Sequence, residues 1–103
     1  MFTAKKQPAE RLDYDIDLTE WFEDAEGDEI ESATATVLLI SGTGVGDTLA
    51  VDGAVALVGD PSRVVKVWLV DGVSGNSYKV TVRATTEGGR IKEVDFKVVV
   101  KET

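Results

Sequence analysis

The sequence contains no cysteine and no histidine, and only two of its 103 residues are proline. Without cysteine the chain cannot form a disulfide, a thiolate nucleophile or a cysteine-based metal site. Without histidine it lacks the side chain that most often acts as a general base. We therefore expect no catalytic residue, no cofactor and no metal ligand, and we predict that the protein is not an enzyme.

Basic residues and long apolar runs are also scarce. The chain has 11 lysines and arginines against 19 aspartates and glutamates, so its net charge of −8 argues against binding to nucleic-acid phosphates. No apolar run follows Lys5 and Lys6, and no stretch is long enough to cross a bilayer. We expect neither a signal peptide nor a membrane partner, and the lack of cysteine fits assembly in a cytoplasm.

What the sequence has in abundance is valine and threonine, which favour strands. Residues 12–18 alternate strictly between apolar and acidic side chains, which predicts a half-buried strand. Thr19 is expected to cap one helical turn, whose Trp21 and Phe22 close an end of the core. Further strands are predicted at residues 30–40, 48–51, 54–58 and 63–70, followed by a closing hairpin over Ser77–Val100.

This pattern predicts an all-β fold, an immunoglobulin-like antiparallel β-sandwich of about seven strands in residues 12–103. A small closed barrel is the alternative. Asp52 and Gly53 are interpreted as the two-residue turn of a hairpin. Residues 1–11 lack periodicity and are expected to form an extended N-terminal arm, which we predict to order only on assembly.

The face pattern of the closing hairpin predicts its register. A two-residue turn at Gly88-Gly89 would place Val82 opposite Asp95 and put a carboxylate on the core face. A three-residue loop, Glu87-Gly88-Gly89, instead places Val82 opposite Val94 and Arg83 opposite Glu93, which is a favourable cross-strand pair. Glycine supplies the left-handed conformation that such a loop needs. We therefore predict the three-residue loop.

Three segments resemble ligand-binding motifs without matching one. In a strand, Asp13, Asp15 and Asp17 lie about 7 Å apart, which is too far to share one calcium ion. The acidic loop at residues 23–29 is the better cation candidate, but its spacing fits no calcium motif. The glycine-rich loop at residues 41–46 lacks the lysine and the following helix of a phosphate-binding loop, and is interpreted as a turn.

An outward-facing tryptophan marks the candidate interaction surface. If Val65, Val67 and Leu69 face the core, Trp68 and Val70 lie on the outer face of the same strand. Either another chain or a neighbouring segment such as the arm would cover them. The residues predicted to contact partners lie in the arm, on the acidic strand and on this strand: Phe2, Lys5, Lys6, Arg11, Asp13, Asp15, Asp17, Trp68 and Val70.

Several segments together resemble a known family of small phage proteins. The segments that carry this resemblance, in chain order, are Lys6-Gln-Pro-Ala-Glu-Arg-Leu-Asp-Tyr-Asp-Ile-Asp-Leu-Thr-Glu-Trp21, Ile30-Glu-Ser-Ala-Thr, Val65-Lys-Val-Trp-Leu, Gly75-Asn-Ser-Tyr-Lys-Val and Gly89-Arg90. The sequence is similar over nearly its whole length to phage fibre-tail adaptors, small immunoglobulin-like virion structural proteins. The acidic loop at residues 23–29 is longer than the corresponding linker of that family.

The resemblance implies a β-sandwich that connects a receptor-binding fibre to the tail by protein–protein contacts, with no catalytic residues. It implies other virion proteins as partners, such as the fibre, the tail tube or distal tail components, with several copies in each particle. The expected location is the virion tail, and the host cytoplasm during assembly. Two alternatives remain: a capsid decoration or head-fibre base protein, and, from another class, a carbohydrate-binding or adhesin module.

Overall fold

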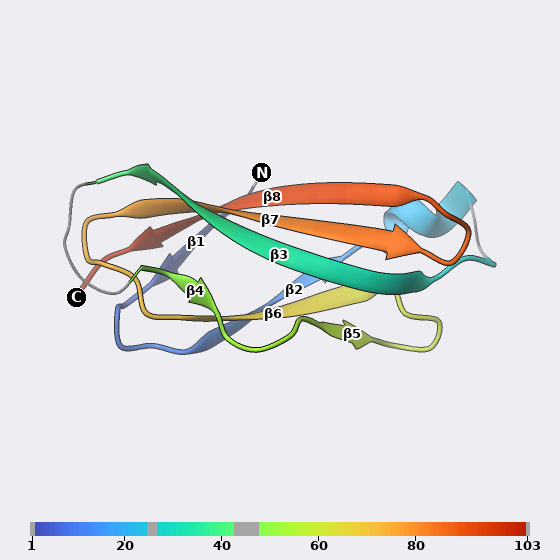
Figure 1. The fold of residues 1–103 in the computed structure, drawn as a ribbon, viewed down its shortest axis with the longest axis horizontal. Helices are drawn as coiled ribbons and strands as arrows, with labels where there is room; N and C mark the ends of the chain where they lie inside the picture. The colour runs from blue at the N-terminus through green and yellow to red at the C-terminus, as the bar shows by residue number, and fades with distance from the viewer. Residues whose placement is uncertain (1, 25–26, 43–47, 103) are drawn as a thin grey trace.

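A computed structural model describes residues 2–24, 27–42 and 48–102. In this part of the chain, eight strands and one 3-10 turn form two packed sheets (Figure 1). The elements are β1 (Thr3–Lys6), β2 (Leu12–Asp17), η1 (Glu20–Asp24), β3 (Ile30–Ser41), β4 (Ala50–Val51), β5 (Ala56–Val58), β6 (Val64–Val70), β7 (Ser77–Thr86) and β8 (Ile91–Val100). The prediction of an all-β fold is confirmed.

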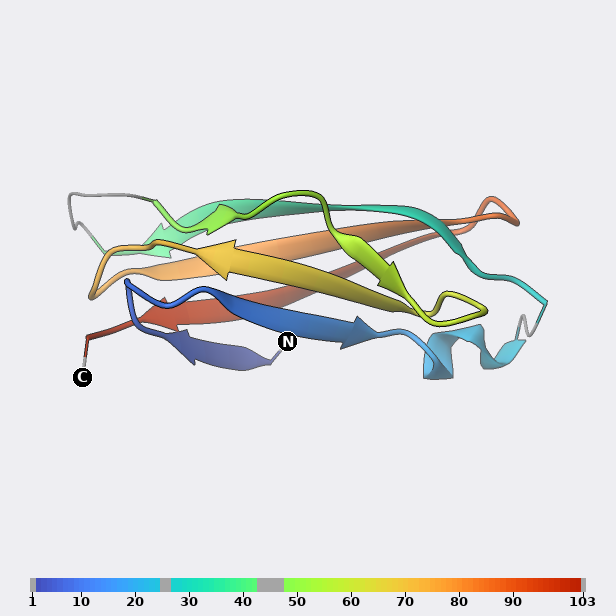
Figure 2. The ribbon, with the colours of Figure 1, turned by 90° about the horizontal axis from the view of Figure 1, so that it is seen from below.

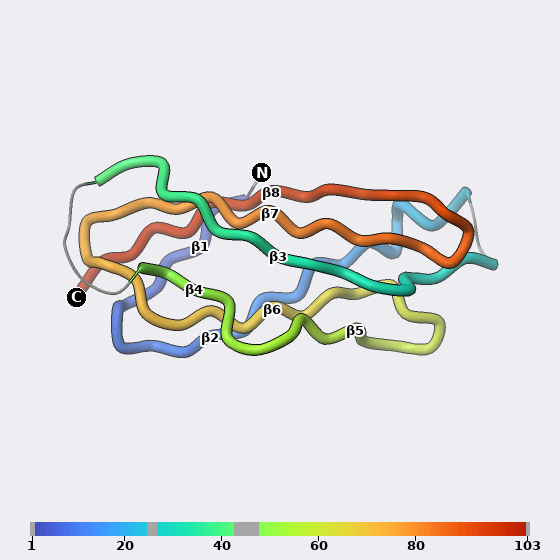
Figure 3. Tube along the Cα trace, in the orientation of Figure 1, coloured from blue at the N-terminus to red at the C-terminus, as the bar shows by residue number. Residues whose placement is uncertain are grey.

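The two sheets differ in the regularity of their edges. Sheet A has the order β1-β8-β7-β3, with β1 parallel to β8 and the other pairs antiparallel. In sheet B, β6 pairs with β2 on one side and with both β4 and β5 on the other, all antiparallel. Within the described residues no strand pair joins the sheets, so the arrangement is two layers and not the closed barrel (Figure 3).

The core lies between the sheets and follows the period-two pattern of the sequence. Val65, Val67 and Leu69 of β6 are fully buried, as are Val80 of β7 and Phe96 of β8. Burying a side chain of this kind contributes roughly 1.5–3 kcal/mol, so the alternating strands provide the main stabilisation.

The helical turn after β2 closes one end of this core, as the sequence predicts. Phe22 of η1 is fully buried, and Trp21 packs edge-on against it with ring centroids 5.0 Å apart. The backbone N–H of Phe22 donates to the carbonyls of Leu18 and Thr19, which fixes the turn.

The register of the closing hairpin is confirmed. Val82 pairs with Val94 and Arg83 with Glu93. Thr86 donates its backbone N–H to the Arg90 carbonyl at 2.9 Å, which leaves residues 87–89 as the three-residue loop. Gly89 has φ +87°, the left-handed conformation expected of a glycine there.

The hairpin predicted at Asp52-Gly53 is wrong. β4 and β5 do not pair with each other, because both run antiparallel to β6. Val51 pairs with Leu69 and Ala56 with Lys66, so four residues of this edge face only two of β6. Gly53 has φ +77°, and the chain bends at this left-handed residue instead of reversing.

The N-terminal segment, expected to be an extended arm, contains strand β1. Its register runs from Thr3 opposite Lys97 to Lys6 opposite Val100. The segment is therefore hydrogen-bonded to β8 within a single chain, which counts against the expectation that it orders only on assembly. The division into an arm at residues 1–11 and a sandwich at residues 12–103 stays a prediction.

The molecule is elongated, measuring 45 × 20 × 19 Å, and its two long sides differ. β1 and β2 end their sheets along one side, and β3 lies with β4 and β5 along the other (Figure 2). On the β1 and β2 side, the ring of Phe96 stacks on Phe2 at 4.7 Å and contacts Tyr14 at 5.7 Å, which closes the gap between the sheets. In the described part of the chain, no helix has the length and apolar character needed to cross a membrane.

Candidate interaction surface

The outer face of sheet B brings together most of the residues predicted to contact partners. The antiparallel register of β2 and β6 places the acidic face of one strand beside the outward-facing residues of the other. The pairs are Asp13 with Trp68, Asp15 with Lys66, and Asp17 with Val64. Val70 lies on the same face of β6 and pairs with Ala50 of β4. Segments about 50 residues apart in the sequence thus form one continuous surface.

Lys66 neutralises two of the three aspartates. Its Nζ lies 2.7 Å from Oδ2 of Asp13 and 3.1 Å from Oδ1 of Asp15. The hydrogen bond from Lys66 lowers the pKa of Asp13, and the same carboxylate raises the pKa of Lys66. The face that the sequence predicted to be acidic therefore carries charges of both signs, and we call this group of alternating charges the charge ladder.

Asp17 bonds to the turn that follows β2. Its Oδ1 accepts a hydrogen bond from the backbone N–H of Thr19 at 2.9 Å and another from the Thr19 hydroxyl. These hydrogen bonds lower the pKa of Asp17. Asp17 thus orders the start of η1. The Thr19 side chain, which the sequence predicted to cap this turn, donates to Asp17 instead.

Trp68 is covered in part by Arg11. The guanidinium carbon of Arg11 lies 4.1 Å from the centre of the indole ring, and its Nε donates to Oδ2 of Asp52. Asp52 in turn donates its backbone N–H to the carbonyl of Trp68 at 2.8 Å. Arg11 therefore lies across the tryptophan from the β2 edge towards the β4 edge, and the indole remains half-buried.

Phe2, Lys5 and Lys6 lie apart from this face, on β1 and the residue before it in sheet A. Phe2 stacks on Phe96 and keeps 46% of its surface exposed. Lys5 is exposed, whereas Lys6 is only 2% exposed. The predicted residues thus form two groups, one on the outer face of sheet B and one at the β1 edge of sheet A.

The Lys6 ammonium group is held inside the chain. Its Nζ donates to the carbonyls of Gln7, Pro8 and Asp71 at 2.9, 3.4 and 2.7 Å. Burial lowers the pKa of Lys6. This lysine connects the N-terminal segment to the loop after β6, and its side chain is not available to a partner in this conformation.

Two residues of the surface, Lys66 and Asp52, were missing from the predicted set. The alternation of β6 already places Lys66 on the outer face beside Trp68, so the sequence pattern was sufficient to include Lys66 in the surface. Asp52 was interpreted as part of a hairpin turn, but the pairing of β4 with β6 decides its position. No sequence pattern indicates the contact between Asp52 and Arg11.

The acidic loop has a structural contact at its end. Oδ1 of Asp28 accepts the backbone N–H groups of Gly88 and Glu29, each at 2.9 Å. A hydrogen bond with the Thr86 side chain is the main cause that lowers the pKa of Asp28. Among the described residues, no group of three acidic side chains could hold a metal ion. Positions 25–26 of this loop and most of the glycine-rich loop (43–47) lie outside the described residues.

The sequence matches the family described as podophage GP4 fibre-tail adaptor protein gp77 over residues 6–99. The chain belongs to this family. Adaptors of this family are structural phage proteins, so the protein has the role of a tail adaptor whose partners are other virion proteins. The resemblance found in the sequence is thereby confirmed. No curated protein matches this chain.

Proposed function

We propose that this protein connects a receptor-binding fibre to the phage tail by docking a partner on the outer face of sheet B. The observation that carries the proposal is the position of Trp68. It lies half-buried among the charges of Arg11, Asp13 and Lys66, and a large aromatic ring surrounded by charged residues is typical of the centre of a docking surface.

The charge ladder supports a role in orientation. Arg11, Lys66 and their carboxylate partners offer both signs of charge at fixed positions, so a partner with the complementary pattern docks in one register. The proposed contacts with the partner make and break no covalent bond, so the protein acts as a structural component and not as an enzyme.

We further propose that the sandwich is immunoglobulin-like, that several copies occupy each particle, and that the copies are part of the tail after assembly in the host cytoplasm. The two-sheet arrangement, antiparallel except for the β1–β8 pair, and the family membership support these points. The carbohydrate-binding alternative is less well supported, because Trp21 in η1 contacts Arg90 and does not share a platform with Trp68.

Removal of the protein from the phage tests the proposal. Phage produced without it should have tails that lack fibres, and supplying the wild-type protein in trans should restore the fibres, counted by negative-stain electron microscopy. Trp68→Asp should restore few or none. Ile91→Asp is the matched control, because Ile91 is 53% exposed on sheet A, away from the proposed surface.

The outcomes separate the role from the surface. Fibres on particles that lack the protein would disprove the connecting role. Full rescue by Trp68→Asp would disprove the assignment of the outer face of sheet B. Circular dichroism of both purified variants establishes that each is folded.

A further inference from the structure

The side of the sandwich opposite β1 and β2 is open. In the described part of the chain, β3 ends sheet A and pairs only with β7. The facing edge of sheet B is broken into β4, with two residues, and β5, with three. Among the described residues no further strand pairs with the outer edge of β3, and the facing edge of sheet B is discontinuous.

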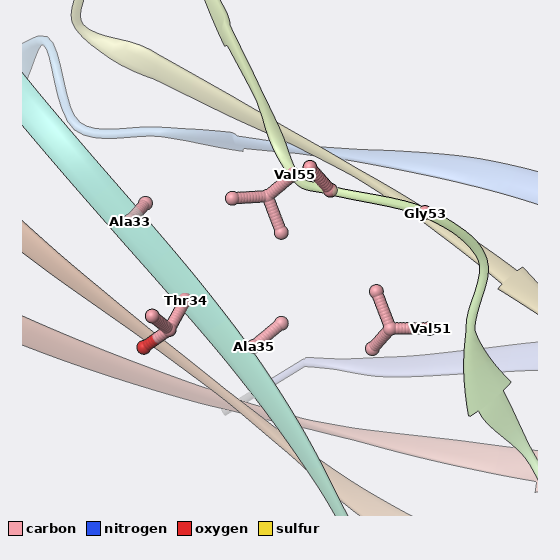
Figure 4. Close-up of a pocket in the computed structure, with 7 residues that line it drawn as sticks. Ala33, Thr34, Ala35, Val51, Gly53 and Val55 are labelled. Carbon is pink, nitrogen blue, oxygen red and sulfur yellow. The ribbon is translucent and has the colours of Figure 1, made fainter.

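A cleft of about 370 Å³ separates these two edges. Its lining comes from β3 and from the bend between β4 and β5: Ala33, Thr34, Ala35, Val51, Gly53, Ala54 and Val55. Ala33 and Ala35 point across the gap towards Val55 and Val51, whereas Thr34 points to the other side of the strand (Figure 4). The cleft floor is apolar, and the small alanine side chains leave it unfilled.

The free edge of β3 is regular and unprotected. Its pairing with β7 is continuous from Ser32 to Leu39, and the register shifts occur only at the two ends. Of its 12 residues only Glu31 is charged, and none is proline or lysine. Exposed edges are usually blocked by such residues or by a bulge, because their free N–H and carbonyl groups pair with any strand available. This edge has kept its capacity to pair.

Two basic residues of β7 lie beside this edge on the outward face, and one of them, Arg83, has Glu93 opposite it on β8. Thr34 pairs with Arg83 and Leu38 pairs with Lys79 on β7, and neither cation makes an ion pair with a described residue. A strand added to β3 would lie about 10 Å from β7, since neighbouring strands are about 4.8 Å apart. The long side chain of Arg83 can span that distance over the small Thr34, whereas Leu38 lies between Lys79 and the added strand. The outward residues of an added strand would therefore meet positive charge.

We propose that this open side binds an extended segment of a partner protein, which pairs with β3 as a new edge strand. Apolar residues at every second position of the segment enter the cleft between Ala35 and Val51. Acidic residues at the alternate positions face Arg83 and Lys79. This second docking site goes beyond the outer face of sheet B and does not depend on it.

A second copy of this chain fits the site less well. Pairing of β3 with another β3 would bring two rows of Arg83 and Lys79 towards each other. The partner segment is instead defined by its chemistry, namely strand-forming residues that alternate with carboxylates.

A synthetic peptide tests this site on the full-length protein. The probe is a fluorescently labelled ten-residue peptide that alternates valine and aspartate, and the control peptide alternates valine and lysine. Fluorescence anisotropy should show saturable binding of the acidic peptide and weaker binding of the basic one. Hydrogen exchange should slow at the amides of residues 32–39. Absence of saturable binding, or protection confined to other strands, would overturn the proposal.

Two variants test the cleft and the charges separately. Ala35→Asp should weaken the acidic peptide roughly tenfold or more, because it places a carboxylate on the apolar floor. Ala9→Asp, the same change at an exposed turn residue, should leave the affinity unchanged. The double variant Lys79→Glu/Arg83→Glu alters only outward-facing residues, and it should reverse the preference in favour of the basic peptide.

The remaining outcomes are decisive. An unchanged affinity in Ala35→Asp, or an unreversed preference in the double variant, would contradict the proposed strand. A protein that forms dimers at micromolar concentration with residues 32–39 protected would show that a second copy occupies the edge. Fibre attachment is not measured in these experiments, so their failure leaves the proposed function standing.

Discussion

Several side chains that the sequence predicts to contact a partner instead form hydrogen bonds within the chain. Asp13 shares a proton-donating lysine with its neighbour Asp15, Asp17 bonds to Thr19, and the Lys6 ammonium group donates to three carbonyls. The physical reason is common to all of them. A charged group that a fold brings near a complementary group gains hydrogen bonds that water supplied in the unfolded chain. A partner that docks here has to recognise the charge pattern that remains.

Asp28 provides the first prediction at this scale. Asp28→Ala removes the acceptor of the Gly88 and Glu29 N–H groups, so the loop of the closing hairpin keeps only the backbone hydrogen bond from Glu87 to Glu29 as its link to the segment before β3. We expect a lower thermal midpoint at pH 7 and faster hydrogen exchange at Gly88. Glu23→Ala, at an exposed residue of η1, is the matched control and should change neither quantity.

The difference in thermal midpoint between the wild type and Asp28→Ala should also depend on pH, in a direction that the pKa of Asp28 defines. Hydrogen bonding holds the pKa of Asp28 below its ordinary value of 3.8 in the folded protein. A carboxyl with a lowered pKa stabilises the fold above the ordinary value, and the stabilisation is lost as the pH falls through the lowered pKa. The difference in midpoint between wild type and Asp28→Ala should therefore shrink below about pH 3.8. A constant difference from pH 7 to pH 2 would contradict the role of the charge.

At the scale of elements, the three-residue loop of the β7–β8 hairpin gives a second prediction. Gly89 has φ +87° and no atom within 4 Å of the position that a Cβ would occupy, so only backbone strain opposes a side chain. Gly89→Ala should lower the free energy of unfolding by about 1–2 kcal/mol, measured by urea denaturation.

Gly27→Ala is the matched control for this change. Gly27 also has an open surrounding, but its φ lies outside the left-handed range, so the same substitution should have little effect on stability. Equal effects of the two substitutions would show that the hairpin loop tolerates a side chain and that the strain is not in Gly89.

How much of the fold the sequence predicts depends on the range of the interactions. The alternation in residues 12–17 and 64–70 is local, so it predicted strands, faces and the outward position of Trp68. The hairpin register followed from the same alternation, because one slip would bury Asp95. Asp52-Gly53 was misassigned because an Asp-Gly pair fits either a reversal or a bend, and the choice depends on whether β6 offers a partner to both flanking segments.

The candidate surface shows the same limit. The aspartates of β2 and the tryptophan of β6 could each be predicted as outward-facing, but their juxtaposition depends on the pairing of β2 with β6, which no local pattern encodes. The strand β1 was missed because its four residues show no period, and a parallel partner almost 100 residues away makes it a strand.

At the scale of the whole molecule, the elongated sandwich separates its surfaces. The outer face of sheet B carries the charge ladder and Trp68, and the open side between β3 and β4 carries the apolar cleft. On one long side the gap between the sheets is closed by Phe2, Tyr14 and Phe96, whereas the other side is open. An adaptor that holds two partners needs two separate surfaces, and the two sites that we propose lie on different sides of this molecule.

The net charge of −8 gives the last prediction, because it acts on the whole molecule. Self-repulsion opposes the compact state, and salt screens it. Salt also weakens the ion pairs of Lys66 and Arg11, but exposed pairs of this kind contribute little to stability. Repulsion therefore dominates, and the thermal midpoint should rise as sodium chloride increases from 0.01 to 0.1 M, where the screening length falls from about 30 to about 10 Å.

A variant with less negative charge tests the cause of this rise. In Glu23→Gln/Glu87→Gln two exposed carboxylates that make no ion pair with a described residue become neutral, so the net charge falls in magnitude and no contact is lost. Its midpoint in 0.01 M salt should be higher than that of the wild type, and its rise with salt should be smaller. A midpoint that falls with salt in both proteins would mean that the ion pairs on the outer face of sheet B outweigh the repulsion. The charge ladder would then contribute to the stability of the fold as well as to the recognition of a partner.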